Sequence, residues 1–500
     1  MILTQENTKH LFSRFKTLAH KSFDKGDYDR CIRDLSLACK TAYTFYIGYT
    51  DAEIEDLIRK ISEQIRKKQS YQPQVNRVVM YDSFSQDAQG LTMQYLDAII
   101  AAGWELLYIT GFNLNDIRSK RIKQTLQEYP KASVIRVSRQ VTPMEQVQYL
   151  YNKIVDYAPS KLFMHFFPDA VSAAVLFYAL PKEIIKYQIN LTDHTYWVGA
   201  GCVDYSFEFR QYGASLSAGR RGIRKDHIFI LPFYPMMKKT VFNGFPKESE
   251  GKVKIFSGSS FYKIIDENDT FFKLNKAILD ANPNAVTLFA GGGDIVMLNG
   301  LITKYGLEGR FIPIGQRNDI FECYKHSDIY LSTYPLFGAL MAQFAAHACL
   351  PILAYANSKS GVVEEVVCQK KKMQITFTEL AALVAEATHL INDEKYRHER
   401  GKAMRDCVID ENEFNQSFKL SVDTGVSQYA ADINENIELH YMSIDDKLKL
   451  ENITKSYQAA ILRSLRVWNT LKISPSIVMD GFMSRIKTSR FGKYFKYHNR

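Results

Sequence analysis

The sequence has few of the features that stabilise secreted or membrane-spanning proteins. Its seven cysteines among 500 residues are scattered and include no Cys-x-x-Cys pair, which disfavours a disulfide framework and a zinc ribbon. No apolar run approaches the roughly 20 residues that cross a bilayer. The first residues, MILTQENTKHLFSRF, contain no apolar segment of the kind found in signal peptides. We therefore expect a cytoplasmic protein in a reducing compartment.

Signatures of metal binding and of phosphate-binding P-loops are also missing from the sequence. The pattern GxxxxGK[ST] does not occur. The one close group of carboxylates after a predicted strand, Asp266, Glu267 and Asp269, is typical of a turn that leads into a helix. We predict no metal site and no cofactor other than a substrate.

Positive charge is concentrated at one end of the chain. The formal net charge is +10, and residues 461–500 hold nine Lys or Arg against the single acid Asp480. Aromatic residues interleave with these cations over 475–500, which favours contact with an anionic membrane surface. A solubilising terminus is the alternative. Nucleic-acid binding is disfavoured because no RNA- or DNA-binding motif accompanies the charge.

Hydrophobic periodicity divides the chain into four parts. Residues 1–70 carry apolar stripes of helical spacing, and 411–500 are predicted to be helical and basic. Between them, short apolar runs alternate with helical segments over 71–245 and again over 250–410, separated by a proline- and glycine-rich linker. The predicted strands are 75–81, 104–110, 133–137, 162–167, 187–191, 227–231, 253–257, 286–290, 311–314, 329–332 and 351–355. This alternation of strands and helices predicts an α/β protein with two Rossmann-like, doubly wound domains that face a shared cleft.

Three loops of the second domain are candidates for holding a phosphorylated ligand. FSGSSFYKI (256–264) follows a strand and could present backbone N–H groups, hydroxyls and a lysine to a diphosphate; the alternative is an ordinary turn. STYPLFGALMAQFAAHACLPILAY (332–355) starts a helix after a strand, and a buried connecting helix is the alternative. FIPIGQRND (311–319) could present backbone groups to a nucleobase. The candidate residues are Ser259, Ser260, Tyr262, Lys263, Gly315, Gln316, Gly338 and Ala339.

In this order the three loops resemble the nucleotide-binding half of GT-B glycosyltransferases. The resemblance extends over 75–410 and is clearest over 253–391. FYKI (261–264) looks like the lysine loop of the O-GlcNAc transferases and the bacterial adhesin N-glycosyltransferases. The resemblance implies that Lys263 and the helix start at Gly338 contact the diphosphate of a UDP-sugar. It also implies that Gly315 and Gln316 lie beside the base.

The helix start also departs from that family. Where those enzymes carry His or Asn, Thr, and an Asp that holds the ribose, this chain has Ala339, Leu340, Met341 and Phe344. The paired glutamates of the large retaining GT-B families are missing too. Two hypotheses follow: a transferase that binds its donor largely through backbone amides, or a catalytically silent partner or scaffold of an active glycosyltransferase.

Candidate acceptor residues follow strands of the first domain. The candidates are Asp87, Gln89 and Gly90 after the first strand and His165 or Asp169 at MHFFPD. In NLTDHTYWVGAGCVDY (190–205), Asp193 and His194 stand at a strand tip. Because sugar transfer needs a base for the acceptor hydroxyl, we predict that His194, or else Asp193, is catalytic. The alternative is that Asp193 caps a helix beside a solvated histidine.

The expected activity is metal-independent transfer of a hexosyl or N-acetylhexosaminyl group from a nucleotide-sugar to a hydroxyl. The expected acceptor is a bacterial surface polysaccharide, such as a capsule or lipopolysaccharide, or a lipid-linked glycan on the inner face of the membrane. Glycosylation of a protein is a further possibility, which the lack of a long repeat array disfavours. Inversion and retention of the anomeric centre both stay open.

Overall fold

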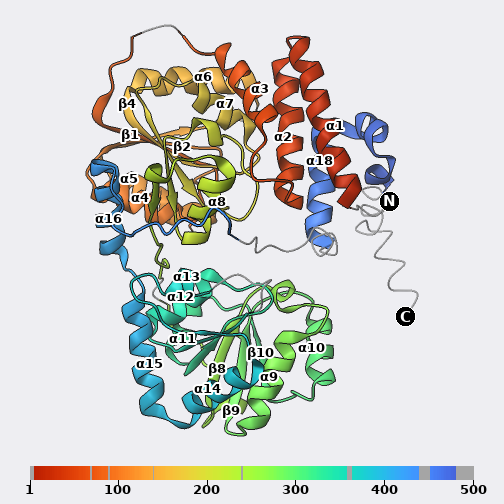
Figure 1. The fold of residues 1–500 in the computed structure, drawn as a ribbon, viewed down its shortest axis with the longest axis vertical. Helices are drawn as coiled ribbons and strands as arrows, with labels where there is room; N and C mark the ends of the chain where they lie inside the picture. The colour runs from red at the N-terminus through yellow and green to blue at the C-terminus, as the bar shows by residue number, and fades with distance from the viewer. Residues whose placement is uncertain are drawn as a thin grey trace.

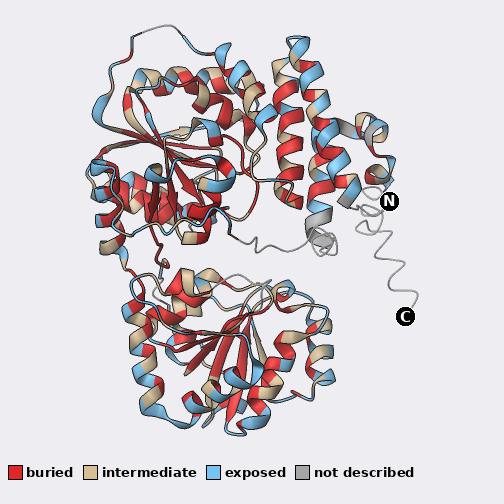
Figure 2. Ribbon diagram, viewed as in Figure 1, coloured by how far each residue is buried: buried red, intermediate tan, exposed pale blue. Residues whose placement is uncertain are grey.

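Two α/β units, one above the other in Figure 1, make up most of the molecule. The computed structural model describes residues 5–67, 70–87, 90–138, 140–237, 240–356, 363–437 and 451–479. Figure 2 shows that the strands of both sheets are buried and that the outward faces of the helices are exposed. This confirms the predicted α/β class with two doubly wound domains.

The first domain contains a seven-stranded parallel sheet of order β3-β2-β1-β4-β5-β6-β7. Its strands are β1 (Gln74–Asp82), β2 (Glu105–Thr110), β3 (Ala132–Arg136), β4 (Pro159–His165), β5 (Ile185–Asn190), β6 (Tyr205–Glu208) and β7 (Ile228–Ile230). Its helices are α4 (Thr92–Ala101), α5 (Lys120–Glu128), α6 (Pro143–Tyr157), α7 (Val171–Ala179) and α8 (Gln211–Arg221). Strand β6 was not among the predicted strands, because it is only four residues long and ends in a buried glutamate.

The second domain contains a six-stranded parallel sheet of order β10-β9-β8-β11-β12-β13. Its strands are β8 (Val253–Gly258), β9 (Ala285–Ala290), β10 (Phe311–Gly315), β11 (Ile329–Leu331), β12 (Ile352–Tyr355) and β13 (Thr376–Phe377). Its helices are α9 (Thr270–Ala281), α10 (Ile295–Lys304), α11 (Ile320–Lys325), α12 (Ala339–His347), α13 (Glu364–Val367), α14 (Leu380–Asn392) and α15 (Glu394–Cys407). Ile255 and Phe256, neighbours on β8, are buried in different core clusters, so both faces of this sheet are apolar and require helices.

Helices from both ends of the chain pack on the first domain. Helices α1 (Gln5–Asp24), α2 (Tyr28–Phe45) and α3 (Ala52–Glu63) lie beside it, and α18 (Glu451–Ile473) packs alongside α2 (Figure 1). Tyr457 of α18 contacts α2 through a hydroxyl contact with Thr41 at 2.8 Å and an edge-to-face ring contact with Phe45. Side-chain caps at Asp27 and Asp51 define the starts of α2 and α3.

Helix α16 (Glu411–Thr424) returns the chain from the second domain to the first (Figure 1). Its Phe418 ring lies 5.2 Å from the ring of Phe163 and 5.6 Å from that of Tyr95, so this helix completes the core under the first sheet. No helix within the described residues is long and apolar enough to span a bilayer. Most of the basic segment 475–500 lies outside the described residues.

Candidate functional site

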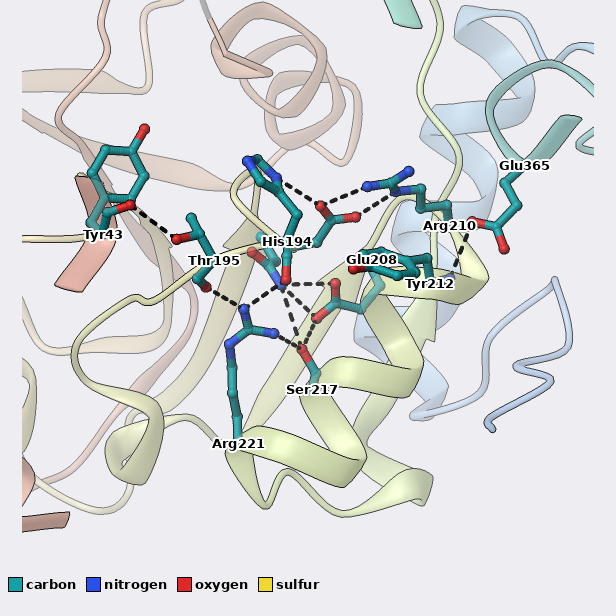
Figure 3. A network of polar contacts seen from close by, with 11 residues as sticks. Tyr43, His194, Thr195, Glu208, Arg210, Tyr212, Ser217, Arg221 and Glu365 are labelled. Atoms are coloured by element: carbon teal, nitrogen blue, oxygen red, sulfur yellow. Dashed lines mark hydrogen bonds and ion pairs between the residues drawn. The ribbon is translucent and has the colours of Figure 1, made fainter. Parts of the chain in front are cut away.

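The carboxyl ends of the two sheets face each other. The backbone N–H of Tyr212, in the first turn of α8, donates to the Glu365 carboxylate of α13 at 3.3 Å (Figure 3). Phe209, directly after β6, packs against the apolar cluster that contains Ala342 and Ala346 of α12. In parallel sheets ligands bind beyond the carboxyl ends of the strands, so this edge is the candidate site for a ligand that contacts both domains.

Backbone hydrogen bonds connect the loops that follow β8, β9 and β10. Ser259 N donates to Ala290 O at 3.0 Å, and Gly291 N donates to Gly315 O at 2.9 Å. The loop before α12 joins them, since Leu336 N donates to Lys263 O at 3.3 Å. The predicted donor residues therefore lie on adjoining loops: Ser259, Ser260, Tyr262, Lys263, Gly315, Gln316, Gly338 and Ala339.

A run of three glycines, Gly291–Gly293, was not among the predicted site residues. A Cβ on Gly291 would lie 1.9 Å from the backbone O of Ser259, and Gly293, with φ of +159°, lies against the Phe261 ring. The loop therefore approaches its neighbours too closely for side chains, as phosphate- and base-binding loops do. The signal was present in the sequence as AGGGD directly after a buried strand.

Lys263 is a half-buried cation in the short 3-10 turn Phe261–Ile264. Burial lowers the pKa of its ammonium group. Within the described residues no carboxylate forms an ion pair with it. Close by, α12 begins at Ala339 after Gly338 with no described side chain capping its first amides. An unpaired cation and uncapped helix amides together favour an anion.

Two departures from the resembled family have clear structural consequences. Leu340 is 40% exposed in the first turn of α12, where it adds no polar ligand. Phe344 instead packs into the domain core, with its ring centroid 6.0 Å from that of Tyr324 and 5.9 Å from that of Phe321. No hydrogen-bonding side chain is therefore supplied at these two positions.

In the first domain, Gly90 and His165 lie together at the ends of β1 and β4. A Cβ on Gly90 would lie 2.8 Å from Cε1 of His165. His165 is fully buried, its Nδ1 lies 3.0 Å from Oδ1 of the buried Asp82, and its Nε2 has no described hydrogen-bond partner. Burial raises the pKa of Asp82, but the His165 contact and the hydroxyl of Tyr108 outweigh it and lower the pKa.

Sequence analysis missed Asp82 because it lies within the strand and becomes a neighbour of His165 only through the order of the sheet. Of the other candidates here, Asp87 has both carboxylate oxygens occupied. They accept from the backbone N–H groups of Arg121 at 3.0 Å and Ile122 at 3.1 Å, so the side chain fixes the start of α5. Gln89 lies outside the described residues.

Asp193 and His194 have different surroundings (Figure 3). Asp193 is buried and accepts from Nε of Arg210 at 2.6 Å and from the second guanidinium nitrogen at 2.9 Å. Burial would raise its pKa, but Arg210 and His194 hold the pKa of this carboxyl well below its usual range. His194 Nδ1 lies 3.3 Å from Asp193 Oδ1, and its side chain is 41% exposed. The geometry favours His194 as the group that meets a substrate and Asp193 as its orienting partner.

A buried polar cluster packs against the loop that carries Asp193 and His194. Glu208 accepts from the amide of Asn190 at 2.9 Å and from the hydroxyl of Ser217 at 2.6 Å, and burial raises its pKa. Arg221 donates to the carbonyls of Asp193 at 2.7 Å and Thr195 at 2.6 Å, and burial lowers its pKa to about 10. The cluster fixes the backbone on both sides of His194.

Comparison with solved structures identifies the architecture. Anabaena Alr3699/HepE in complex with UDP matches with a TM-score of 0.51 at 13% identity, over 70% of this chain and 100% of that chain. The same protein in complex with UDP-glucose matches with a TM-score of 0.50 at 14% identity, over 70% and 99%. The chain has the GT-B fold.

The lipopolysaccharide outer core galactosyltransferase WaaB in its apo form also matches, with a TM-score of 0.49 at 13% identity, over 70% of this chain and 99% of that chain. No family model matches the sequence, and no curated protein matches it. Across the described parts of the chain, no group of three or more His, Cys, Asp or Glu side chains could hold a metal ion.

Proposed function

We propose that the protein is a glycosyltransferase that moves a sugar from a nucleotide donor to a hydroxyl acceptor. The observation that carries the proposal is Lys263, a half-buried cation with no described carboxylate partner, beside the uncapped start of α12. A nucleoside diphosphate supplies the negative charge that this arrangement favours. UDP is the proposed nucleotide, a choice supported by the complexes of HepE with UDP and UDP-glucose.

The two domains have complementary roles in the proposed reaction. The acceptor hydroxyl attacks C1 of the donor sugar, the bond from C1 to the diphosphate oxygen breaks, and the hydroxyl proton passes to a base. His194 is the proposed base, because a contact between Asp193 and its Nδ1 leaves Nε2 to accept the proton. Lys263, the Ser259 and Ser260 loop and the α12 amides meet the charge that develops on the leaving UDP.

Other ligand contacts are part of the same proposal. Gly315 and Gln316 lie beside the base, and Gly90 and His165 border the acceptor. No metal takes part. The resemblance of the lysine loop to that of the O-GlcNAc and adhesin N-glycosyltransferases supports the proposed contact of Lys263 with the diphosphate. The proposed transferred group is a hexose or an N-acetylhexosamine.

The proposed acceptor is a bacterial surface polysaccharide or a lipid-linked glycan. We propose that the protein acts in the cytoplasm and contacts the anionic inner membrane surface through residues 475–500, where cations and aromatic residues interleave. Trp468, 78% exposed on α18, would extend this surface. Sedimentation with vesicles of phosphatidylserine and phosphatidylcholine tests this, with a chain ending at residue 474 as control.

Nucleotide binding gives the primary test of the proposal. UDP, GDP, CMP and ADP are compared by thermal shift, since a ligand at 100 times its Kd stabilises the folded state by about 2.7 kcal/mol. We expect UDP alone to raise the melting temperature, and Lys263→Ala to weaken UDP binding about tenfold or more. Lys276→Ala, which breaks a surface pair with Asp280 on α9, should bind UDP as the wild type does. Unchanged UDP affinity in Lys263→Ala would remove this lysine from the site.

A second candidate function is a silent GT-B subunit that supports an active glycosyltransferase. The apolar residues Leu340 and Phe344 favour it, because they take the place of polar donor ligands. Release of UDP from UDP-glucose and UDP-N-acetylglucosamine without acceptor separates the two functions. Slow hydrolysis that His194→Ala or Lys263→Ala abolishes supports the transferase, and UDP binding without hydrolysis of any donor supports the silent subunit.

A further inference from the structure

The N-terminal helices reach the edge where the two sheets face each other. Helix α2 ends at Phe45, and Tyr46 follows in the left-handed conformation with φ of +53°. Tyr43 in the last turn of α2 and Tyr49 after the helix are bonded to the loop that carries His194. Thr195 Oγ1 donates to Tyr43 O at 3.1 Å, and Trp197 N donates to Tyr49 O at 3.4 Å. The end of α2 is therefore held in one position relative to the proposed base.

Side chains of this turn lie around His194. The Tyr46 ring makes an edge-to-face contact with the His194 imidazole at a centroid distance of 6.1 Å. In Figure 3 the Tyr43 ring and the His194 imidazole both point away from the Glu208 and Arg221 cluster. Tyr43 and Tyr46 are each only partly buried. A tyrosine is less stable than glycine in the left-handed region, so the Tyr46 side chain does not favour the turn.

The second domain contributes to the same surroundings. Burial, Asp169 and Tyr262 together raise the pKa of Tyr43, which puts Tyr262 of the second domain within electrostatic reach of a helix of the N-terminal extension. Tyr262 is 47% exposed and directly precedes Lys263. Tyr43 is thus bonded to the loop that carries the proposed base and lies near Tyr262 of the loop that carries Lys263.

We propose that the C-terminal turn of α2 is the acceptor subsite, in which Tyr43 and Tyr46 stack against a sugar ring of a neutral glycan. This inference rests on the proposed function and identifies its acceptor class. The C–H face of a pyranose packs on an aromatic ring, while its hydroxyls need polar partners at the ring edges. Asp169 and Lys40 supply such partners beside Tyr43.

Charge favours a neutral glycan over a phosphorylated acceptor. Lys40 Nζ lies 3.4 Å from Oδ2 of Asp169 and 5.5 Å from the Tyr43 ring centroid, so its charge is already compensated. A phosphate would have to displace Asp169 to bind Lys40. The paired groups can instead donate and accept hydrogen bonds with hydroxyls.

Variants of the two tyrosines separate this subsite from the fold and from the donor site. Tyr46→Gly removes the ring and suits the left-handed backbone, so the turn should form at least as well. Tyr43→Ala removes the second ring. Tyr149→Ala, at a 49% exposed tyrosine on α6, is the matched control. Thermal shift with UDP confirms that each variant folds and still binds the donor nucleotide.

The probe is an array of immobilised neutral and anionic oligosaccharides, read in the presence of saturating UDP. We expect the wild type and Tyr149→Ala to retain a set of neutral glycans. Tyr46→Gly and Tyr43→Ala should each bind these glycans with an affinity lower by a factor of about five or more. Retention only of phosphorylated glycans, no retained glycan, or equal binding by all variants would overturn the inference. Failure of UDP to bind the wild type would instead overturn the proposed function, since that readout does not involve α2.

Discussion

Removing the charge of Asp193 should destabilise the first domain rather than simply abolish a catalytic step. In Asp193→Asn, the Arg210 side chain, which is only 11% exposed, keeps its charge while its carboxylate partner, at 2.6 and 2.9 Å, is replaced by a neutral amide. Breaking a buried pair by removing one partner typically costs about 3–5 kcal/mol. Glu365, which also acts on the charge of Arg210, compensates part of this loss, so we expect a cost of about 3 kcal/mol.

Tryptophan fluorescence during urea unfolding measures this cost. The three tryptophans lie at residues 104, 197 and 468, in the first domain and in α18. Trp197 is buried four residues from Asp193, and the second domain has no tryptophan, so the signal reports the first domain. Asp226→Asn, which breaks the exposed pair with Arg224, should change the free energy of unfolding by less than about 0.5 kcal/mol.

The pH dependence of the free energy of unfolding gives an independent check of this prediction. The folded-state pKa of Asp193 is lowered, so its contribution to stability is present above its unfolded value of about 3.9 and is lost as the pH falls further. The stability difference between wild type and Asp193→Asn should therefore be constant from pH 8 to pH 5. A difference below about 1 kcal/mol at pH 7, with transferase activity lost, would refute this reasoning and favour Asp193 as the base.

Three further predictions concern the site and the helical extension. His194→Gln should lower the rate of transfer about a hundredfold or more while the UDP-induced thermal shift stays unchanged; equal rates would exclude it as the base. Gly291→Ala should weaken UDP binding about tenfold because its Cβ would lie 1.9 Å from the backbone O of Ser259 in the donor loop, whereas Gly300→Ala, in open space on α10, should not. Burial raises the pKa of Asp34 to about 6, so its ionised form costs stability near pH 7. Asp34→Asn should raise the free energy of unfolding at pH 7 by about 1–3 kcal/mol, measured by urea unfolding. This gain should shrink as the pH falls from 6 to 4, and a gain that stays constant would contradict the assigned pKa.

The sheets could be predicted from sequence because their central strands are continuous apolar runs. Strands β1 and β8 bury residues such as Val79 and Phe256, and no other element type suits such short runs between helices. Strands β6 and β13 have four and two residues, which are too few to show the hydrophobic pattern of a strand in the sequence. Their presence depends on pairing with β5 and β12, which is a tertiary property.

The proximity of the loops after β8, β9 and β10 was also predictable, because parallel strands bring their carboxyl ends to one edge. Side-chain partnerships were not. The pairing of Asp82 with His165 joins residues 83 positions apart, and Arg210 reaches Asp193 from 17 residues away. Sequence spacing alone places Asp193 beside His194 and so suggests two candidates for the base, with the imidazole preferred only for its usual pKa. Only the ion pair, visible in three dimensions, distinguishes the buried carboxylate from the accessible imidazole.

The return of α16 to the first domain has a consequence for biosynthesis. The ribosome completes the first sheet at β7, but the aromatic core beneath it needs Phe414 and Phe418, which pack on Tyr95. About 200 further residues, including the whole second domain, must be translated first, which takes about 10–40 s at typical elongation rates. During this interval the apolar face that α16 later covers is open to solvent. The nascent first domain should therefore be a chaperone client until the second domain has emerged.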